Sequence, residues 1–83
     1  MARVPSPAAV LIGSRIAERR QALNLKVDQL AVRADVDSSN VRGYESGRST
    51  MNLRTLVRIA DALKISPGKL ISGVTSEMFN APE

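Results

Sequence analysis

The sequence contains no cysteine and no histidine among its 83 residues. Without these side chains the chain can form no disulfide, and most zinc and redox-metal sites are excluded. Tyr44 and Phe79 are the only aromatic residues. Aliphatic side chains must therefore fill the core, which favours thin packed helices over a β-sandwich.

A long apolar run is also missing. No segment is apolar enough to span a bilayer, and the first residues lack the apolar stretch of a secretory signal. We therefore expect no membrane partner and a cytoplasmic protein. A chain of this length forms one domain at most.

Positive charge is in modest excess, with a formal net charge of +4. Such an excess suits phosphate binding but is shared by proteins with other roles. Seven of the basic residues lie between positions 15 and 48, namely Arg15, Arg19, Arg20, Lys26, Arg33, Arg42 and Arg48.

Capping residues, prolines and left-handed turn formers divide the chain into five predicted helices. They run from Pro7 to Asn24, over 27–34, from Asp37 to Ser46, from Asn52 through Leu63, and from Pro67 to Gly73. We expect Asp37 to cap the third helix. The apolar stripe of the fourth consists of Leu53, Leu56, Ile59, Ala60 and Leu63, and the fifth buries Leu70 and Ile71.

The helical domain is expected over residues 8–73. Residues 1–7 form a flexible arm, in which Arg3 either reaches DNA or is disordered, as proline-rich termini more often are. Residues 74–83 form a polar tail that frays or takes part in dimerisation. A dimer surface is expected on the fifth helix and this tail, where Leu70, Ile71, Val74, Met78 and Phe79 exceed the needs of a small core.

Two short predicted helices joined by Ala34-Asp35-Val36 indicate a helix-turn-helix unit. A helix about 10–12 Å across fits the major groove of B-DNA if it presents small or flexible polar side chains. The residues predicted to face outward from the second helix and contact DNA are Ser38, Ser39, Asn40, Arg42 and Gly43. In isolation, the same small polar residues also suit an ordinary solvated helix start.

Several motifs together resemble the lambda-repressor-like (XRE-type) family over about residues 12–71. They are Ile12-Gly13-Ser14-Arg15-Ile16, Leu30-Ala31, Tyr44-Glu45-Ser46-Gly47-Arg48, and the run from Leu53-Arg54-Thr55-Leu56 to Ile59-Ala60-Asp61-Ala62-Leu63. The resemblance implies an all-α fold of five short helices with the recognition helix at about residues 38–46. It also implies contacts to the DNA backbone from Lys26, Val27, Ser46, Arg48 and Thr50.

The resemblance implies a sequence-specific transcription regulator that binds double-stranded DNA. Since one domain reads few base pairs, we expect a homodimer on a near-palindromic operator. The chain departs from the family at Lys26-Val27, where Ser or Thr followed by Gln is usual, at Asp35 in place of the turn glycine, and at Met51 in place of proline. These departures leave open a protein-interaction module, such as an antitoxin-type domain with weak DNA binding. A fragment of a longer protein is a further alternative.

Arg20 falls on the apolar stripe of the first predicted helix, between Ile16 and Leu23. An arginine there is costly to bury unless it is paired. Glu45, beside the inward-facing Tyr44, is the expected partner, and the resemblance implies the same structural pair. Arg15, Arg19 and Arg33 are expected to be ordinary solvated surface residues.

The sequence contains no recognisable catalytic constellation. Asp28, Asp35 and Asp37 lie near the predicted turn, but each has a local structural role. We therefore expect no enzyme, no cofactor, no metal site and no small-molecule ligand.

Overall fold

The computed structural model describes residues 5–80, and all regular secondary structure in this range is helical. It forms five α-helices and one 3₁₀-helix: α1 (Pro7–Ala22), α2 (Val27–Ala34), α3 (Ser38–Glu45), α4 (Leu53–Ala62), α5 (Pro67–Ile71) and η1 (Ser76–Phe79). The five predicted helices and the all-α fold class are therefore confirmed. Arg3 and the rest of residues 1–4 lie outside the described part of the chain, as do residues 81–83.

Local caps explain most of the helix starts. The hydroxyl of Ser6 accepts a hydrogen bond from the Ala9 amide at 3.1 Å, and Pro7 occupies the first helical position of α1. The side-chain oxygen of Asn52 caps α4 by accepting from the Thr55 amide at 2.8 Å. The predicted cap of α3 is wrong in one respect, because the exposed Asp37 carboxylate makes no capping hydrogen bond.

Left-handed residues end the first, second and fourth helices within two residues of the last turn. Asn24, Asp35 and Lys64 have φ angles of 58°, 58° and 59°. Asn and Asp tolerate this conformation better than most residues with a Cβ atom. The predicted ends at Asn24 and Asp35 follow from that tolerance.

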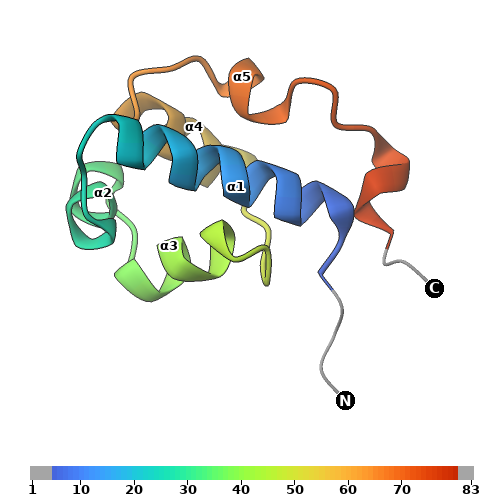
Figure 1. Cartoon of the computed structure of the whole chain (residues 1–83), viewed down its shortest axis with the longest axis horizontal. Coiled ribbons are helices and arrows are strands. Elements are labelled where there is room, and N and C mark those ends of the chain that lie inside the picture. The colour runs from blue at the N-terminus through green and yellow to red at the C-terminus, as the bar shows by residue number, and fades with distance from the viewer. Residues whose placement is uncertain (1–4, 81–83) are drawn as a thin grey trace.

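The helices pack around an aliphatic core. Figure 1 shows α1 crossing the molecule, with α3 on one side, α5 on the other, α4 behind and α2 at one end. Fully buried side chains come from each α-helix or its immediate C-terminal cap: Ile16, Leu30, Val41, Ile59, Leu63 and Leu70. The core therefore holds α2 and α3 in a fixed relation to the rest of the domain.

Two of the predicted core residues are exposed. Leu53 is 74% exposed, because it lies on the first turn of α4 at the edge of the core. Ile71 is 41% exposed while its neighbour Leu70 is 1% exposed. Consecutive helical residues point about 100° apart, and in this short helix Leu70 takes the direction that faces the core.

The C-terminal segment contains a further short helix within its described part, residues 74–80. Residues 76–79 form η1, which packs beside the first turns of α1 (Figure 1). Val74 packs against the core, Met78 is half-buried, and Phe79 remains 50% exposed. The wholly buried Leu70 belongs to the core, so it cannot form part of an outer dimer surface.

Two arginines of α1 hold the ends of other helices. Arg15 donates hydrogen bonds to the carbonyls of Leu70 at 3.1 Å and Ser72 at 2.7 Å. Arg19 donates to the Leu63 carbonyl at 2.9 Å. These carbonyls lie where helices end and lack intrahelical donors. The expectation of solvated arginines is therefore wrong for Arg15 and Arg19, whereas Arg33 is exposed as expected.

Candidate nucleic-acid interface

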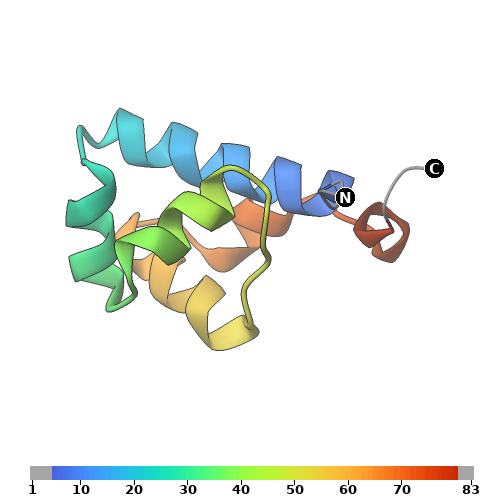
Figure 2. The same cartoon turned by 90° about the horizontal axis from the view of Figure 1, so that it is seen from below.

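The second helix of the helix-turn-helix unit, α3, presents polar side chains along one face. Ser39, Asn40 and Arg42 are exposed, and Ser38 is half-buried at the start of the helix. On the opposite face Val41 is completely buried and Tyr44 packs against the core. Viewed from below, α3 lies at the front of the domain with the following loop beside it (Figure 2). This outer face can donate and accept hydrogen bonds without any change in packing.

Gly43 departs from the predicted outward set, because it is buried. A Cβ atom placed on Gly43 would lie 2.8 Å from the Ser49 hydroxyl oxygen. The loop after α3 folds back over this position, so the glycine provides a close contact between helix and loop. The outward placement predicted for Gly43 is therefore wrong.

The loop after α3 is fixed by several hydrogen bonds to the helix end. Gly47 turns the chain with a φ of 79°, and the Arg48 amide then donates to the Gly43 carbonyl at 3.0 Å. The same carbonyl accepts from the Ser46 hydroxyl at 3.1 Å. That hydroxyl accepts from Nε of Arg48 at 3.0 Å. Ser46, Arg48 and Thr50 are exposed, so three of the predicted backbone-contacting residues share this loop.

The start of α2 carries the other two predicted backbone contacts. Lys26 is exposed, and its amide donates to the side-chain oxygen of Gln29 at 2.8 Å. Val27 is half-buried and packs against the core, so it offers a DNA backbone only its main-chain amide. Polar side-chain chemistry at this end of the interface therefore comes from Lys26.

An ion pair joins α2 to the outer face of α3. Nη2 of Arg42 lies 3.3 Å from Oδ1 of Asp28, and the two side chains are 57% and 73% exposed. A pair this exposed contributes at most about 1 kcal/mol. Arg42 can therefore exchange Asp28 for a phosphate or a base at little cost.

Behind the interface, Arg20 and Glu45 form the expected pair between α1 and α3. Nε of Arg20 donates to Oε2 of Glu45 at 2.7 Å, and Nη2 donates to Oε1 at 3.0 Å. Nη1 donates to the Leu25 carbonyl at 2.8 Å, so the guanidinium is held on three sides. The hydrogen bond to Glu45 raises the pKa of Arg20 above its ordinary value, against the opposing effect of burial. The pair fixes the C-terminal end of α3 against α1.

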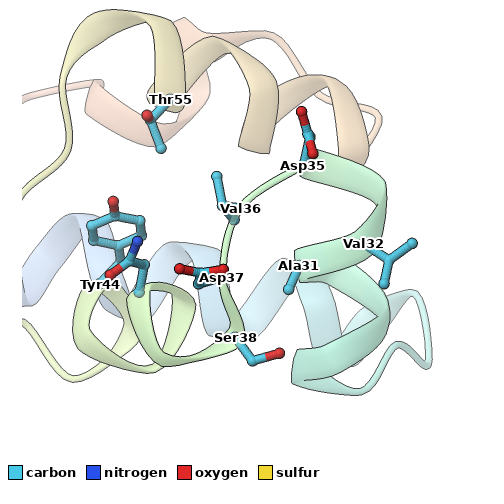
Figure 3. Close-up of a pocket in the computed structure, with 9 residues that line it drawn as sticks. Ala31, Val32, Asp35, Val36, Asp37, Ser38, Tyr44 and Thr55 are labelled. Atoms are coloured by element: carbon cyan, nitrogen blue, oxygen red, sulfur yellow. The ribbon is translucent and has the colours of Figure 1, made fainter.

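An open groove of about 630 Å³ lies between the turn, α3 and α4. Figure 3 shows Val36, Tyr44 and Thr55 around it, each from a different segment. Asp35 and Asp37 also line it and are exposed. Because both carboxylates are exposed to solvent, the groove does not form an enclosed binding site for a ligand.

Two contributors to the interface were not found from the sequence. The sequence predicts only a local structural role for Asp28 and none for Ser49. Their partners Arg42 and Gly43 are 14 and six positions away along the chain, and each contact depends on how two segments cross. No periodicity or motif in the sequence encodes that crossing.

Neither metal nor membrane chemistry is indicated in the described range. Residues 5–80 bring together no group of three acidic, histidine or cysteine ligands. None of the helices in this range combines the length and apolar character that a bilayer crossing requires.

Comparison with known proteins gives the same arrangement. The helix-turn-helix family profile matches residues 16–70, which span α2, α3 and α4 together with the last seven residues of α1 and the first four of α5. The cryptic phage CTXphi transcriptional repressor RstR of Vibrio cholerae is 37% identical over 59 residues, which make up 71% of this chain and 53% of the repressor. The chain thus spans about half the length of that curated relative.

Solved structures extend the similarity to three dimensions. The restriction-modification controller protein C.AhdI from Aeromonas hydrophila superposes with a TM-score of 0.73 at 35% identity, over 75% of this chain and 94% of the controller. The P22 c2 repressor in complex with a synthetic operator superposes with a TM-score of 0.72 at 28% identity, over 76% of this chain and 96% of the repressor. The chain therefore belongs to the lambda-repressor-like (XRE-type) helix-turn-helix family.

Proposed function

We propose that the protein is a sequence-specific DNA-binding transcription regulator and not an enzyme, acting in the cytoplasm at the nucleoid. The observation that carries this proposal is the outer face of α3, where Ser39, Asn40 and Arg42 are exposed on a helix held rigidly from behind. Serine can pair with any base edge, asparagine suits adenine, and arginine suits guanine or a phosphate. The relatives named as repressors and the operator complex support the same function.

Contacts to the DNA backbone would come from both sides of α3. Lys26 at the start of α2 and Arg48 in the loop after α3 are exposed cations. Ser46 and Thr50 add hydroxyl groups, and the Val27 amide adds a main-chain donor at a helix N-terminus. These groups position the protein on the duplex, whereas Ser38, Ser39, Asn40 and Arg42 read bases.

A homodimer on a near-palindromic operator extends this proposal. Two recognition helices then enter successive major grooves about 34 Å apart. Apolar surface at the C-terminal end supports such pairing, since Ile71 and Phe79 are 41% and 50% exposed.

The experiment is a salt titration of binding to a random duplex and to a site obtained by selection. We expect the affinity for both to fall linearly with salt on a logarithmic scale, and the selected site to bind at least about 1,000-fold more tightly.

An interaction module of the antitoxin type is the second candidate, favoured by the half-buried Val27, which offers no polar side chain at the start of α2. Absence of binding to either duplex at about 50 mM salt would favour this candidate over the regulator.

A further inference from the structure

We propose that Asp28 is a positioning residue for Arg42, which biases this arginine towards a base and away from the phosphates that every sequence offers. The inference rests on the proposed DNA-binding function and deepens it. It assigns to Asp28 a part in sequence specificity beyond its local role at the start of α2.

Arg42 is the charged side chain of the outer face of α3, beside the neutral Ser39 and Asn40. A free arginine on such a face has two kinds of target, since it can pair with the edge of a guanine or with a phosphate. Only the first contact carries sequence information, because phosphates are the same at every site. Whatever restrains the guanidinium of Arg42 therefore acts on specificity.

Asp28 supplies such a restraint from the first turn of α2. Its Oδ1 lies 3.3 Å from Nη2 of Arg42, and among residues 5–80 the guanidinium has no other hydrogen-bond partner. The contact occupies one of the five N–H donors of a guanidinium and leaves the others free. A guanine needs two of these donors, for its O6 and N7 atoms, so Arg42 can pair with Asp28 and with a guanine at once.

The charge of Asp28 distinguishes the two targets. The edge of a guanine is neutral, whereas a phosphate that shares the guanidinium with Asp28 brings a second negative charge close to the carboxylate. The two anions then lie within the Debye length of about 8 Å at physiological salt, so part of their repulsion remains unscreened. Because the pair is exposed, its effect is a bias of at most about fivefold and not a barrier to DNA binding.

The neighbours of Asp28 in the first turn of α2 are engaged elsewhere. Oε1 of Gln29 accepts a hydrogen bond from the Lys26 amide at 2.8 Å. Val27 is half-buried and packs against the core, and Leu30 is completely buried. These contacts anchor the start of α2 on the same core that holds α3. The carboxylate of Asp28 is thus presented to α3 from a fixed stretch of main chain.

The test is the ratio of the affinities for a selected site and a random duplex, measured on the full chain with Asp28→Asn, Arg42→Ala and the double variant. We expect Asp28→Asn to bind the random duplex more tightly, because Arg42 is then free for phosphates, and the ratio to fall about threefold. In the Arg42→Ala background the same substitution should leave the ratio unchanged. Asp28→Glu keeps a carboxylate and should keep most of the wild-type ratio.

Glu18→Gln is the matched control for the loss of one negative charge. Glu18 is exposed and lines a shallow surface with Arg15, Arg19 and Lys69. This surface lies on the α5 side of α1, opposite α3 (Figure 1). The control should change the affinity for both duplexes alike and leave their ratio at the wild-type value.

Three results would overturn the proposal. One is an Asp28→Asn variant that keeps or raises the wild-type ratio, since Asp28 would then act only as a general negative charge. Another is an equal fall of the ratio in the Arg42→Ala background, since Asp28 would then contact a base itself. The third is an Asp28→Glu variant whose ratio falls as far as that of Asp28→Asn. A wild-type protein that binds neither duplex would instead overturn the regulator function.

Folding of the variants is checked by circular dichroism. Both side chains of the pair are exposed, so we expect melting temperatures within about 5 °C of the wild type. The ratio of two affinities is also independent of the folded fraction, because unfolded protein lowers both apparent affinities alike. A change in the ratio therefore reports on DNA recognition and not on stability.

Discussion

Arg20 and Glu45 meet through two hydrogen bonds at a place where their side chains are 13% and 12% exposed. Glu45→Ala leaves the guanidinium largely buried without its carboxylate, at an expected cost of about 3 kcal/mol. For a domain of this size that loss lowers the melting temperature by roughly 10–20 °C. Thermal unfolding followed by circular dichroism measures it, with the exposed Glu18→Ala as the matched control. Equal melting temperatures for the two variants would contradict the prediction.

The stabilisation that this pair contributes to the folded state depends on pH through the titration of Arg20. Because the raised pKa of Arg20 means that the folded state holds this proton more tightly, the stabilisation is fully present below the ordinary arginine pKa. It is lost only as the pH rises through the raised value. Titration of Arg20 therefore removes none of this stabilisation at neutral pH.

Base reading and phosphate contact are separable by single substitutions. Ser39→Ala removes a hydroxyl from the outer face of α3, so we expect a relaxed preference at particular base pairs. Arg48→Ala removes a charge from the loop, so all duplexes should bind more weakly alike, with the salt slope lower by about one. Quantitative selection of bound sequences for each variant measures both effects. A change of sequence preference in Arg48→Ala would show that this residue reads bases.

Between elements, the approach of α1 to α3 depends on Gly13. A Cβ atom there would collide with the Tyr44 carbonyl oxygen and lie 2.9 Å from that of Glu45. Both oxygens belong to the main chain, so they can move away only if α3 moves as a whole. We expect Gly13→Ala to lower the free energy of unfolding by roughly 2–3 kcal/mol, despite the better helix propensity of alanine.

Gly68→Ala is the control for this prediction, since nothing lies within 4 Å of its added methyl group. That variant should be neutral or slightly stabilising, because it gains helix propensity without a collision. Urea unfolding of the two variants gives the comparison. A Gly13→Ala variant as stable as Gly68→Ala would exclude the collision.

The link between α1 and α5 depends on Arg15. Arg15→Ala removes the donors to the carbonyls of Leu70 and Ser72, each a charged hydrogen bond worth about 1.5–3 kcal/mol. We expect amides of α5 and the segment after it to exchange faster with solvent, while those of α2 and α3 keep their rates. Arg33→Ala, an exposed arginine on α2, is the matched control. Uniformly faster exchange would instead indicate global destabilisation.

Local chemistry explains which elements could be predicted from the sequence. Ser6-Pro7, Asn24 and Asn52 act within one turn of the chain, so the limits of α1 and the start of α4 follow from them. Contacts between elements depend on helix crossings, which residue spacing does not define. For this reason the prediction of solvated side chains is wrong for Arg15 and Arg19, and the prediction of an outward-facing residue is wrong for Gly43.

For the molecule as a whole, the exposed apolar residues at the C-terminal end predict its state of association. Ile71 and Phe79 line a small apolar pocket together with Ala9 and Ile12. We expect Phe79→Asp to weaken pairing of two copies by at least about tenfold, because a charge in an apolar contact is costly to desolvate. Sedimentation over a range of concentrations measures it, with Val32→Asp, at an exposed position on α2, as the control. A monomer at every concentration in the wild type would contradict the homodimer.

The close approach of α1 to α3 at Gly13 also has a consequence for the proposed homodimer. At Gly13 no side chain separates α1 from the main chain of α3, and we therefore expect the two helices to move together. In the proposed homodimer, a rotation of one copy relative to the other at the α5 end would then carry the proposed recognition helix with it. The surface through which two copies pair would then determine the distance between the two half-sites of the operator. We expect substitutions on that surface to change the preferred half-site spacing and to leave the base contacts unchanged.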